Sequence, residues 1–242
     1  GCFNTDFSAT MSCFVGNTGS TAITVRTPVA SRTGHIVVAN GDGSDTSGET
    51  AIIDSPYIRN TSPLSGPAGQ YVTIRGTNFG DDPGQVFFDD IEAEVQCADG
   101  WEDEQIIVAV PEGFTSAATP LIQVITQEGK YSNEEGFTIT AGEPGPGICE
   151  LQPDCSDTGA DNVTAIGENF GASGTVYFDP SEGDYVEGDV SLWDVFNSTY
   201  NSQTIVTDGT PVTEPDTYNF TAGNASGISN GLDFDITCTE PP

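Results

Sequence analysis

The nine residues Val72-Thr-Ile-Arg-Gly-Thr-Asn-Phe-Gly80 decide the fold, because they recur as Val163-Thr-Ala-Ile-Gly-Glu-Asn-Phe-Gly171. Six of the nine positions are identical. Each copy begins as a short strand and ends in a turn that is rich in glycine and asparagine, which is typical of a β-sheet protein with tight connections. A repeat of this kind indicates a chain that is built from copies of one structural unit.

A second pair of matching segments closes each copy. Ser132-Asn133, followed after three residues by Phe137-x-Ile139-Thr140, recurs as Ser229-Asn230 followed by Phe234-x-Ile236-Thr237. The repeat therefore predicts a complete unit over residues 55–141 and a second, divergent unit over residues 142–242. The segment Ala141–Gly147 between them is rich in Gly and Pro, so we expect a stiff linker and an extended rod with small contacts between the units.

Residues 1–54 match only the later half of the repeat. Phe3–Cys13 aligns without gaps on Phe87–Cys97, but nothing in this segment corresponds to residues 56–84. Those residues supply the first two predicted strands of the complete unit, so the segment is predicted to be an incomplete unit. We expect its core to be completed by an upstream part of a longer repeat chain or by a strand from a neighbouring subunit, which would polymerise the protein.

Short strands separated by turns are predicted throughout the complete unit. Most are β-branched or aromatic, and several alternate between apolar and polar residues, as expected of a sandwich strand with one solvated face. The 29 Gly and 15 Pro of the 242-residue chain argue against helices. About seven strands in each unit predict an all-β chain of tandem immunoglobulin-like β-sandwiches. The predicted strands are 70–75, 85–88, 93–97, 105–110 and 121–126.

A series of motifs follows in order along the complete unit: Pro56-Tyr-Ile, Ser62–Gly69, Val72–Gly80, Val86-Phe-Phe, Trp101, Ile106–Pro111, Gly129 and Ser132-Asn133. Through these motifs the unit resembles the IPT/TIG domain, an immunoglobulin-like fold. Residues 156–237 resemble this family more loosely, and residues 1–54 resemble only its later half. The resemblance implies tandem arrays in surface proteins and receptor ectodomains, and it supplies no catalytic residues.

The charge of the chain excludes several classes of partner. There are 37 acidic residues against 5 Lys and Arg, which is a formal net charge of −32. Nucleic-acid binding requires Lys and Arg at the phosphates, so we exclude it, together with the transcription factors of the family. No apolar run approaches the roughly 18 residues of a membrane span, so none is predicted in this chain.

The cysteines are interpreted as disulfide candidates in an extracellular setting, with free buried thiols as the alternative, because none lies in a C-x-x-C pair. We expect Cys2 to pair with Cys13, and Cys238 to pair with Cys149 or Cys155. Cys97 would then pair with the remaining one of these two across the junction between the units. The six candidates are Cys2, Cys13, Cys97, Cys149, Cys155 and Cys238.

No catalytic set is identified, and the chain is predicted not to be an enzyme. The single histidine, His35, begins a predicted strand, and acids are too numerous for any pair to be informative. The loops 76–80 and 167–171 are interpreted as structural turns, because Gly supplies a positive φ, Asn tolerates it and Phe plugs the end of the sandwich. The acidic stretch 40–49 lacks EF-hand spacing. No cofactor is predicted, and calcium is kept only as a general counterion without an assigned ligand set.

These features predict a non-enzymatic extracellular structural protein, a subunit of a cell-surface stalk or filament. It would self-associate into a polymer or continue in a longer repeat chain. Two alternatives stay open: an adhesin or a module that binds carbohydrate or a receptor, and an accessory region of a larger secreted enzyme. A binding module needs an exposed aromatic platform, and the candidates for one are Trp101, Trp193, Tyr185 and Tyr200. The family resemblance assigns Trp101 a semi-buried packing role instead.

Overall fold

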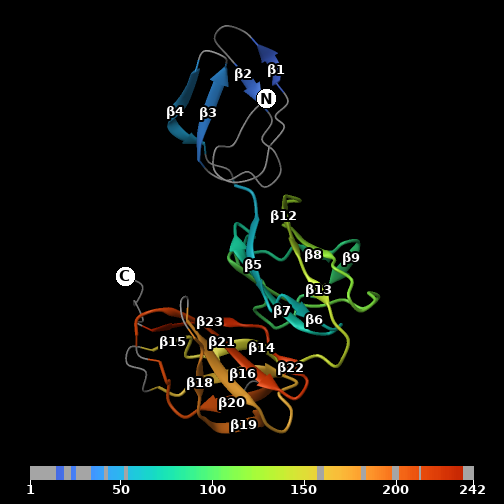
Figure 1. Ribbon diagram of the computed structural model, residues 1–242, viewed down its shortest axis with the longest axis vertical. Helices are drawn as coiled ribbons and strands as arrows, with labels where there is room; N and C mark the ends of the chain where they lie inside the picture. The colour runs from blue at the N-terminus through green and yellow to red at the C-terminus, as the bar shows by residue number, and fades with distance from the viewer. Residues whose placement is uncertain are drawn as a thin grey trace.

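The structure is a computed structural model, and it is an all-β fold, as predicted. Figure 1 shows two sandwiches in contact with each other, which we call the first sandwich (β5 to β13) and the second sandwich (β14 to β23). The predictions for Cys2, Cys13, Cys238 and Tyr200 lie outside the described residues. The residues described are 15–18, 23–25, 34–40, 43–51, 54–156, 161–180, 184–197, 202–212 and 214–236.

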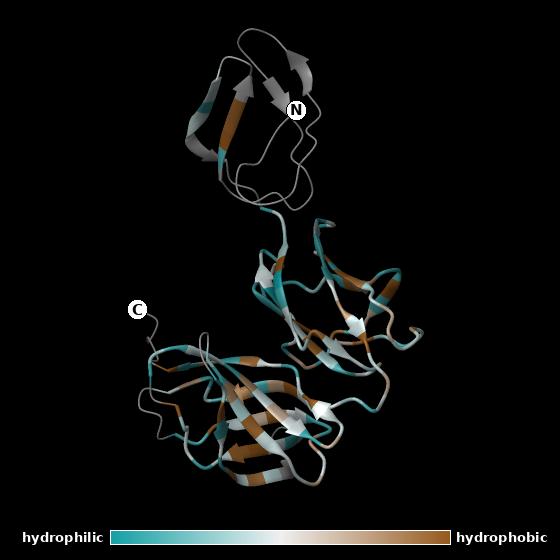
Figure 2. Ribbon diagram, in the orientation of Figure 1, coloured by the Kyte–Doolittle hydropathy of each residue, from teal (hydrophilic) through white to brown (hydrophobic). Residues whose placement is uncertain are grey.

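The first sandwich has two main antiparallel sheets, with strand orders β10-β7-β5 and β12-β11-β8-β9. A short parallel pair, β6 and β13, is added to them. Figure 2 shows that apolar residues lie along the strands of both sandwiches. The strands are β5 (Tyr57–Ser62), β6 (Ser65–Gly66), β7 (Tyr71–Thr77), β8 (Gln85–Phe88), β9 (Ile91–Ala93), β10 (Gln105–Ala109), β11 (Leu121–Ile125), β12 (Tyr131–Gly136) and β13 (Thr138–Ile139).

The second sandwich repeats this plan with one sheet of order β14-β16-β20-β19 and another of order β15-β23-β21-β17-β18, to which β22 is added beside β21. Its strands are β14 (Gly147–Gln152), β15 (Cys155–Ser156), β16 (Thr164–Glu168), β17 (Thr175–Asp179), β18 (Val186–Gly188), β19 (Val190–Asn197), β20 (Ser202–Thr207), β21 (Thr217–Asn224), β22 (Gly227–Ile228) and β23 (Leu232–Ile236).

Two short antiparallel pairs precede the sandwiches, β1 (Val15–Thr18) with β2 (Ile23–Val25), and β3 (Gly34–Asn40) with β4 (Gly43–Ala51). Three consecutive aliphatic side chains of β3, at residues 36–38, are between 38% and 50% exposed. That an upstream part of the chain or a neighbouring subunit supplies a strand to cover them stays a prediction.

The repeated Ser-Asn pair plays the same structural part in both sandwiches. The side chain of Asn133 accepts a hydrogen bond from the Ile58 amide at 2.7 Å and donates one to the Ile58 carbonyl at 3.0 Å. Asn230 makes the same two bonds with Ile148, at 2.7 and 2.8 Å. Each asparagine therefore fixes an early strand of its sandwich to a segment near its end, which explains why the pair recurs at the end of the repeat.

The predicted structural role of the glycine loops is confirmed. Asn78 and Asn169 have φ values of 60° and 58°, in the left-handed region that asparagine tolerates. The phenylalanine that follows each of them, Phe79 or Phe170, is fully buried. Each loop therefore places a phenylalanine that fills one end of its sandwich.

Candidate functional site

The outer face of the β10-β7-β5 sheet is covered by the second sandwich. β7 is buried at every position from Tyr71 to Gly76, although only alternate side chains of a strand can point into one core. Val72 and Ile74 belong to the core of the first sandwich, whereas Tyr71 belongs to the core cluster of the second. The expectation of one solvated face is therefore wrong for this sheet.

The sequence of β10, which lies in the same sheet, indicates this burial. In β10, Ile106 and Val108 pack in the first core, whereas Ile107 joins Tyr71 in the second cluster. The run Ile106-Ile-Val-Ala-Val is continuously apolar, which is the pattern of a strand with both faces buried. The two sandwiches therefore share apolar contacts across this sheet.

The Gly- and Pro-rich segment between the sandwiches is part of their interface and not a spacer. Gly145 and Gly147 are buried, and the Gly145 amide donates to the side chain of Gln70 at 2.8 Å. A Cβ added at Gly147 would lie 2.5 Å from the ring of Tyr71, so glycine permits the Tyr71 ring to pack directly on the backbone of the segment between the sandwiches. The prediction of a rod with small contacts is therefore wrong for this junction.

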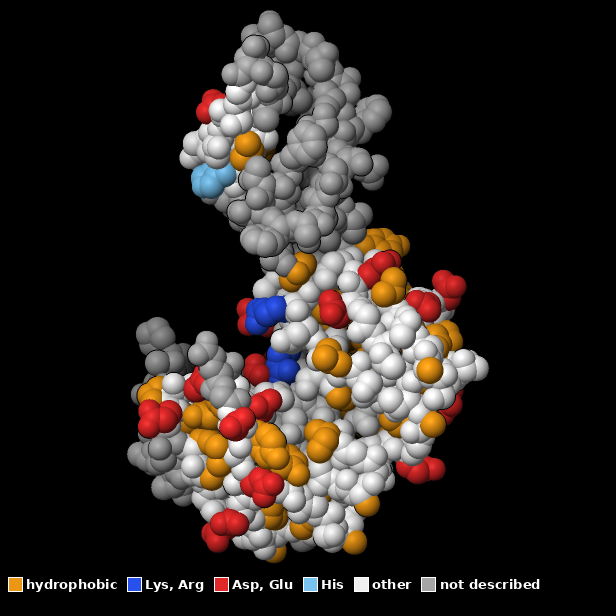
Figure 3. Space-filling view, viewed as in Figure 1, with side chains coloured by type: hydrophobic (Ala, Val, Ile, Leu, Met, Phe, Trp, Pro, Cys, Tyr) orange, Lys and Arg blue, Asp and Glu red, His pale blue; other side chains and the backbone are white. Residues whose placement is uncertain are grey.

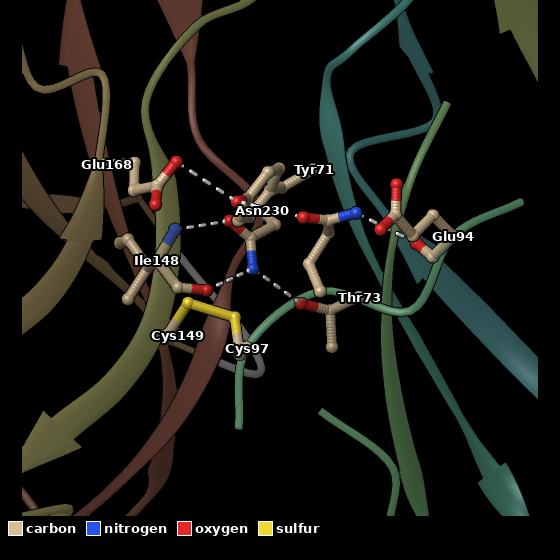
Figure 4. Close-up of a disulfide and its surroundings, with 9 residues drawn as sticks. Tyr71, Thr73, Glu94, Cys97, Ile148, Cys149, Glu168 and Asn230 are labelled. Carbon is tan, nitrogen blue, oxygen red and sulfur yellow. Dashed lines mark hydrogen bonds between the residues drawn. A yellow bond between two sulfur atoms is a disulfide. The ribbon is translucent and has the colours of Figure 1, made fainter. Parts of the chain in front are cut away.

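A disulfide also crosses the junction. Cys97 is bonded to Cys149, with their Cα atoms 5.5 Å apart, as Figure 4 shows. The sequence left Cys149 and Cys155 open as partners of Cys97, and the structure contains the bond to Cys149. Cys155 is disulfide-bonded as well. Because Cys149 is bonded to Cys97, the predicted alternative in which Cys238 pairs with Cys149 is excluded.

Arg75 is a buried cation at the centre of the junction. The side chain of Arg75 lies 2.7 Å from a carboxylate oxygen of Asp233, and it donates hydrogen bonds to the Asn219 side chain at 3.0 Å and to the Gly231 carbonyl at 2.9 Å. All three acceptors belong to the second sandwich. Arg75 belongs to the repeated motif, but no separate role is predicted for it from the sequence. The available signal was a cation in an apolar strand, at a position where the second copy has Ile166.

Arg75→Met is expected to lower the free energy of unfolding by about 2 to 3 kcal/mol, because hydrogen bonds to charged groups are lost while most of the buried apolar volume is kept. Urea unfolding of both proteins measures the difference. Arg59→Met is the matched control, since Arg59 is exposed and donates only a 3.3 Å bond to the Gly76 carbonyl. Equal stability of the two variants would contradict the assigned role of Arg75.

Tyr71 and Asn230 complete the polar part of the junction (Figure 4). The Tyr71 hydroxyl lies 3.4 Å from a carboxylate oxygen of Glu168 and 3.2 Å from the side-chain oxygen of Gln96. Burial, and then the negative charge of Glu168, raise the pKa of Tyr71 to about 12. Asn230 also donates to the Thr73 hydroxyl at 3.0 Å. The junction is thus hydrogen-bonded as well as apolar.

The raised pKa predicts a loss of stability in alkali. The unfolded chain releases the Tyr71 proton near its ordinary pKa of 10.0, whereas the folded chain keeps it up to about 12. The contribution is therefore complete below pH 10 and is lost between 10 and 12, by at most about 2 to 3 kcal/mol. Unfolding curves at several alkaline pH values should show a smaller decline for Tyr71→Phe than for the unaltered chain. Parallel curves would contradict this assignment.

A polar cleft of about 870 Å³ opens beside the junction. Arg75 and Asp233 line it, together with acidic side chains that include Glu102, Glu104 and Asp154.

In the described part of the chain, no group of three or more His, Cys, Asp or Glu side chains could hold a metal ion. Within the same residues, no helix is long and apolar enough to cross a membrane.

The two tryptophans are structural residues and not parts of a platform. Trp101 is only 7% exposed and donates its indole N–H to the Gly80 carbonyl at 2.9 Å. Trp193 is half-buried and donates to the Gly171 carbonyl at 3.0 Å. Each indole therefore binds the last glycine of a repeated loop, which confirms the packing role expected of Trp101. Tyr185, in contrast, is 58% exposed.

The fold and this junction define a class, a chain of immunoglobulin-like β-sandwiches joined by a covalent and buried contact. Residues 56–139 match the IPT/TIG domain family, so the first sandwich is an IPT/TIG domain. The predicted resemblance is thereby confirmed for this part of the chain.

Known proteins similar to the chain include a cyclomaltodextrin glucanotransferase of Bacillus licheniformis, which is 31% identical over 150 residues. The match covers 61% of this chain but only 19% of the transferase, so the chain spans about a fifth of this relative. Among solved structures, the Gamma-CGTASE from an alkalophilic Bacillus clarkii covers 94% of this chain and is matched over 35% of its own length, with 19% identity and a TM-score of 0.35. SGBP-B from a xyloglucan utilization locus in Bacteroides uniformis has 19% identity and a TM-score of 0.27, over 75% of this chain and 49% of its own.

Proposed function

We propose that the chain is a non-catalytic accessory region of a larger extracellular protein that acts on glucan. The class of that protein is supported by the 31% identity to a cyclomaltodextrin glucanotransferase, a relative of which the chain spans only a fifth. On this proposal, the residues that perform the transferase chemistry lie in the part of that relative that this chain does not match. The proposal takes up one of the alternatives to the filament hypothesis.

The junction is the observation that carries the proposal. A disulfide, a buried arginine and a shared apolar cluster hold the two sandwiches against each other. Contacts between domains of one chain are often small and permit relative motion, whereas a covalent and apolar junction favours one fixed arrangement. A fixed pair of sandwiches can hold the regions attached at its two ends at a set distance and orientation.

An extracellular location is part of the proposal. The Cys97–Cys149 disulfide is the kind of bond that persists in oxidising compartments. The acidic composition agrees with a protein that must stay soluble outside the cell.

The native polypeptide tests this function. Mass spectrometry of the secreted protein should find these 242 residues within a longer chain that also contains a glucan-converting region. Replacement of residues 55–236 by a flexible Gly-Ser linker should then lower activity on polymeric glucan more than activity on short oligosaccharides. A native chain that carries no glucan-converting region would overturn the proposal.

The filament hypothesis remains a second candidate, because β3 exposes three consecutive aliphatic side chains and, among the described residues, is paired with β4 alone. Such a strand could accept another by pairing of its edge. Electron microscopy of the native protein would distinguish the two functions, since ordered polymers are expected only for the filament subunit.

A further inference from the structure

The outer face of the second sandwich carries an exposed tyrosine, Tyr185, beside a half-buried one, Tyr177. Tyr177 points outward from β17, because its neighbours Val176 and Phe178 are fully buried in the core. The ring of Tyr185, which directly precedes β18, meets the ring of Tyr177 edge to face, with centroids 5.2 Å apart. From the sequence only Tyr185 of this pair is a candidate, because the outward direction of Tyr177 follows only from the register of β17.

An isoleucine extends this pair across the sheet. Ile228 in β22 is 47% exposed and pairs with Gly223 in β21. A Cβ at Gly223 would lie 2.7 Å from the Ile228 side chain and 3.2 Å from the Tyr177 ring, so both side chains lean over this glycine. Tyr185, Tyr177 and Ile228 therefore form a continuous row, which we call the tyrosine row. It runs across β18, β17, β21 and β22, and three strand spacings of about 4.8 Å give it a length of about 14 Å.

The chemistry of the tyrosine row fits a sugar chain. Exposed contiguous apolar side chains on a soluble protein mark an interaction surface, and a tyrosine presents both an apolar ring and a polar hydroxyl. A sugar ring likewise has an apolar C–H face for the ring and hydroxyls at its edge. Polar partners for those hydroxyls lie beside the row, because the exposed Glu187 is paired with Tyr177 across β18 and β17.

The charge of the chain restricts the ligand further. A formal net charge of −32 repels acidic polysaccharides, nucleic acids and anionic membranes, whereas it has no such effect on a neutral sugar. Figure 3 shows that hydrophobic side chains also gather on one face of the second sandwich, between acidic ones. The row therefore fits a neutral ligand that combines apolar and hydroxylated surfaces.

We infer that the tyrosine row is a binding site for a neutral α-glucan chain, with the exposed Tyr185 as the stacking residue, Tyr177, whose ring stands perpendicular to it, as an apolar contact beside it, and Glu187 as a hydrogen-bond acceptor. The inference rests on the proposed function, since the similarity to a cyclomaltodextrin glucanotransferase selects an α-glucan among neutral polysaccharides. It goes beyond a spacer role, because the second sandwich would itself hold the polymer.

Binding of maltoheptaose and soluble amylose to the 242-residue chain, by calorimetry and by retardation in amylose-containing native gels, tests the inference. Tyr185→Ala and Tyr177→Ala are each expected to weaken binding by about tenfold, as expected when an anchoring aromatic residue is truncated. The matched control is Tyr131→Ala, which removes a tyrosine that is 52% exposed on β12 of the first sandwich and should leave binding unchanged. Circular dichroism shows whether each variant keeps its fold.

Four results would overturn the inference. The first is a wild-type chain that is not retarded by amylose, and the second is an equal loss of binding in Tyr131→Ala. The third is a wild-type dimer that dissociates on Tyr185→Ala, because the row would then be an interface between two copies. Retardation by mixed-linkage β-glucan as strong as by amylose would also contradict the choice of an α-glucan. If the chain fails to bind while the native polypeptide converts glucan, the site is wrong and the accessory function stands.

Discussion

Replacement of both Cys97 and Cys149 by serine is expected to lower the free energy of unfolding by about 4 kcal/mol. The disulfide closes a loop of 52 residues, and its removal restores chain entropy to the unfolded state. The loss should be largest for the coupling between the sandwiches, because the bond crosses their junction. Calorimetry is expected to show one cooperative transition for the unaltered chain and two separated transitions for the double variant.

Substitution is preferable to chemical reduction in this experiment. Cys155 is also disulfide-bonded, so a reducing agent would break more than the bond at the junction. Arg75→Met in the double-serine background measures whether the polar clamp and the disulfide act on the same junction, since coupled sites give non-additive changes. A double-serine variant that unfolds in one transition at unchanged urea concentration would show that the disulfide does not couple the sandwiches.

Phe178→Ala is expected to lower the free energy of unfolding by about 3 to 5 kcal/mol. Phe178 is fully buried, and its ring meets those of Phe220 and Phe234 edge to face, at 5.1 and 5.6 Å between centroids. The substitution removes these ring contacts and leaves a cavity that close-packed strands cannot collapse to fill. Urea unfolding followed by tyrosine and tryptophan fluorescence measures the loss.

Tyr177→Ala is the matched control for this substitution. Tyr177 is adjacent in the same strand but points to the opposite face of the sheet, so its truncation should change the free energy of unfolding by less than about 1 kcal/mol. Similar losses for both variants would contradict the register of β17. The same variant serves in the glucan-binding experiment, where it must fold normally for its loss of affinity to be interpreted.

The core of each sandwich could be predicted from the sequence alone. The repeat pairs Phe137 with Phe234, and both are buried in the structure. In the first sandwich, the ring of Phe88 meets the ring of Phe137 edge to face, with centroids 5.5 Å apart. In the second sandwich, the ring of Phe178 meets the ring of Phe234 in the same way. The two copies share three local requirements: an asparagine with a positive φ, a phenylalanine that fills the end of the sandwich, and an asparagine that joins an early segment to a late one. These shared requirements explain why identical residues stand at matching positions.

The location of the candidate sites could not be predicted, because their partners are distant in sequence. Two of the three acceptors of Arg75, Asn219 and Gly231, are 144 and 156 residues away, and no local pattern encodes such a contact. The tyrosine row depends likewise on strand order, since Tyr177 and Ile228 meet only through β21.

The sequence by itself determined the all-β class, the repeat, the IPT/TIG resemblance and the structural role of the glycine loops. Each of these follows from spacing within a few strands and turns, where backbone conformation and side-chain alternation act locally. Only the tertiary structure decided that the Gly- and Pro-rich segment is buried, that Cys97 pairs with Cys149 and that Arg75 is a junction residue. The physical reason is that a sandwich has two outer faces, and composition alone does not state which face another sandwich will cover.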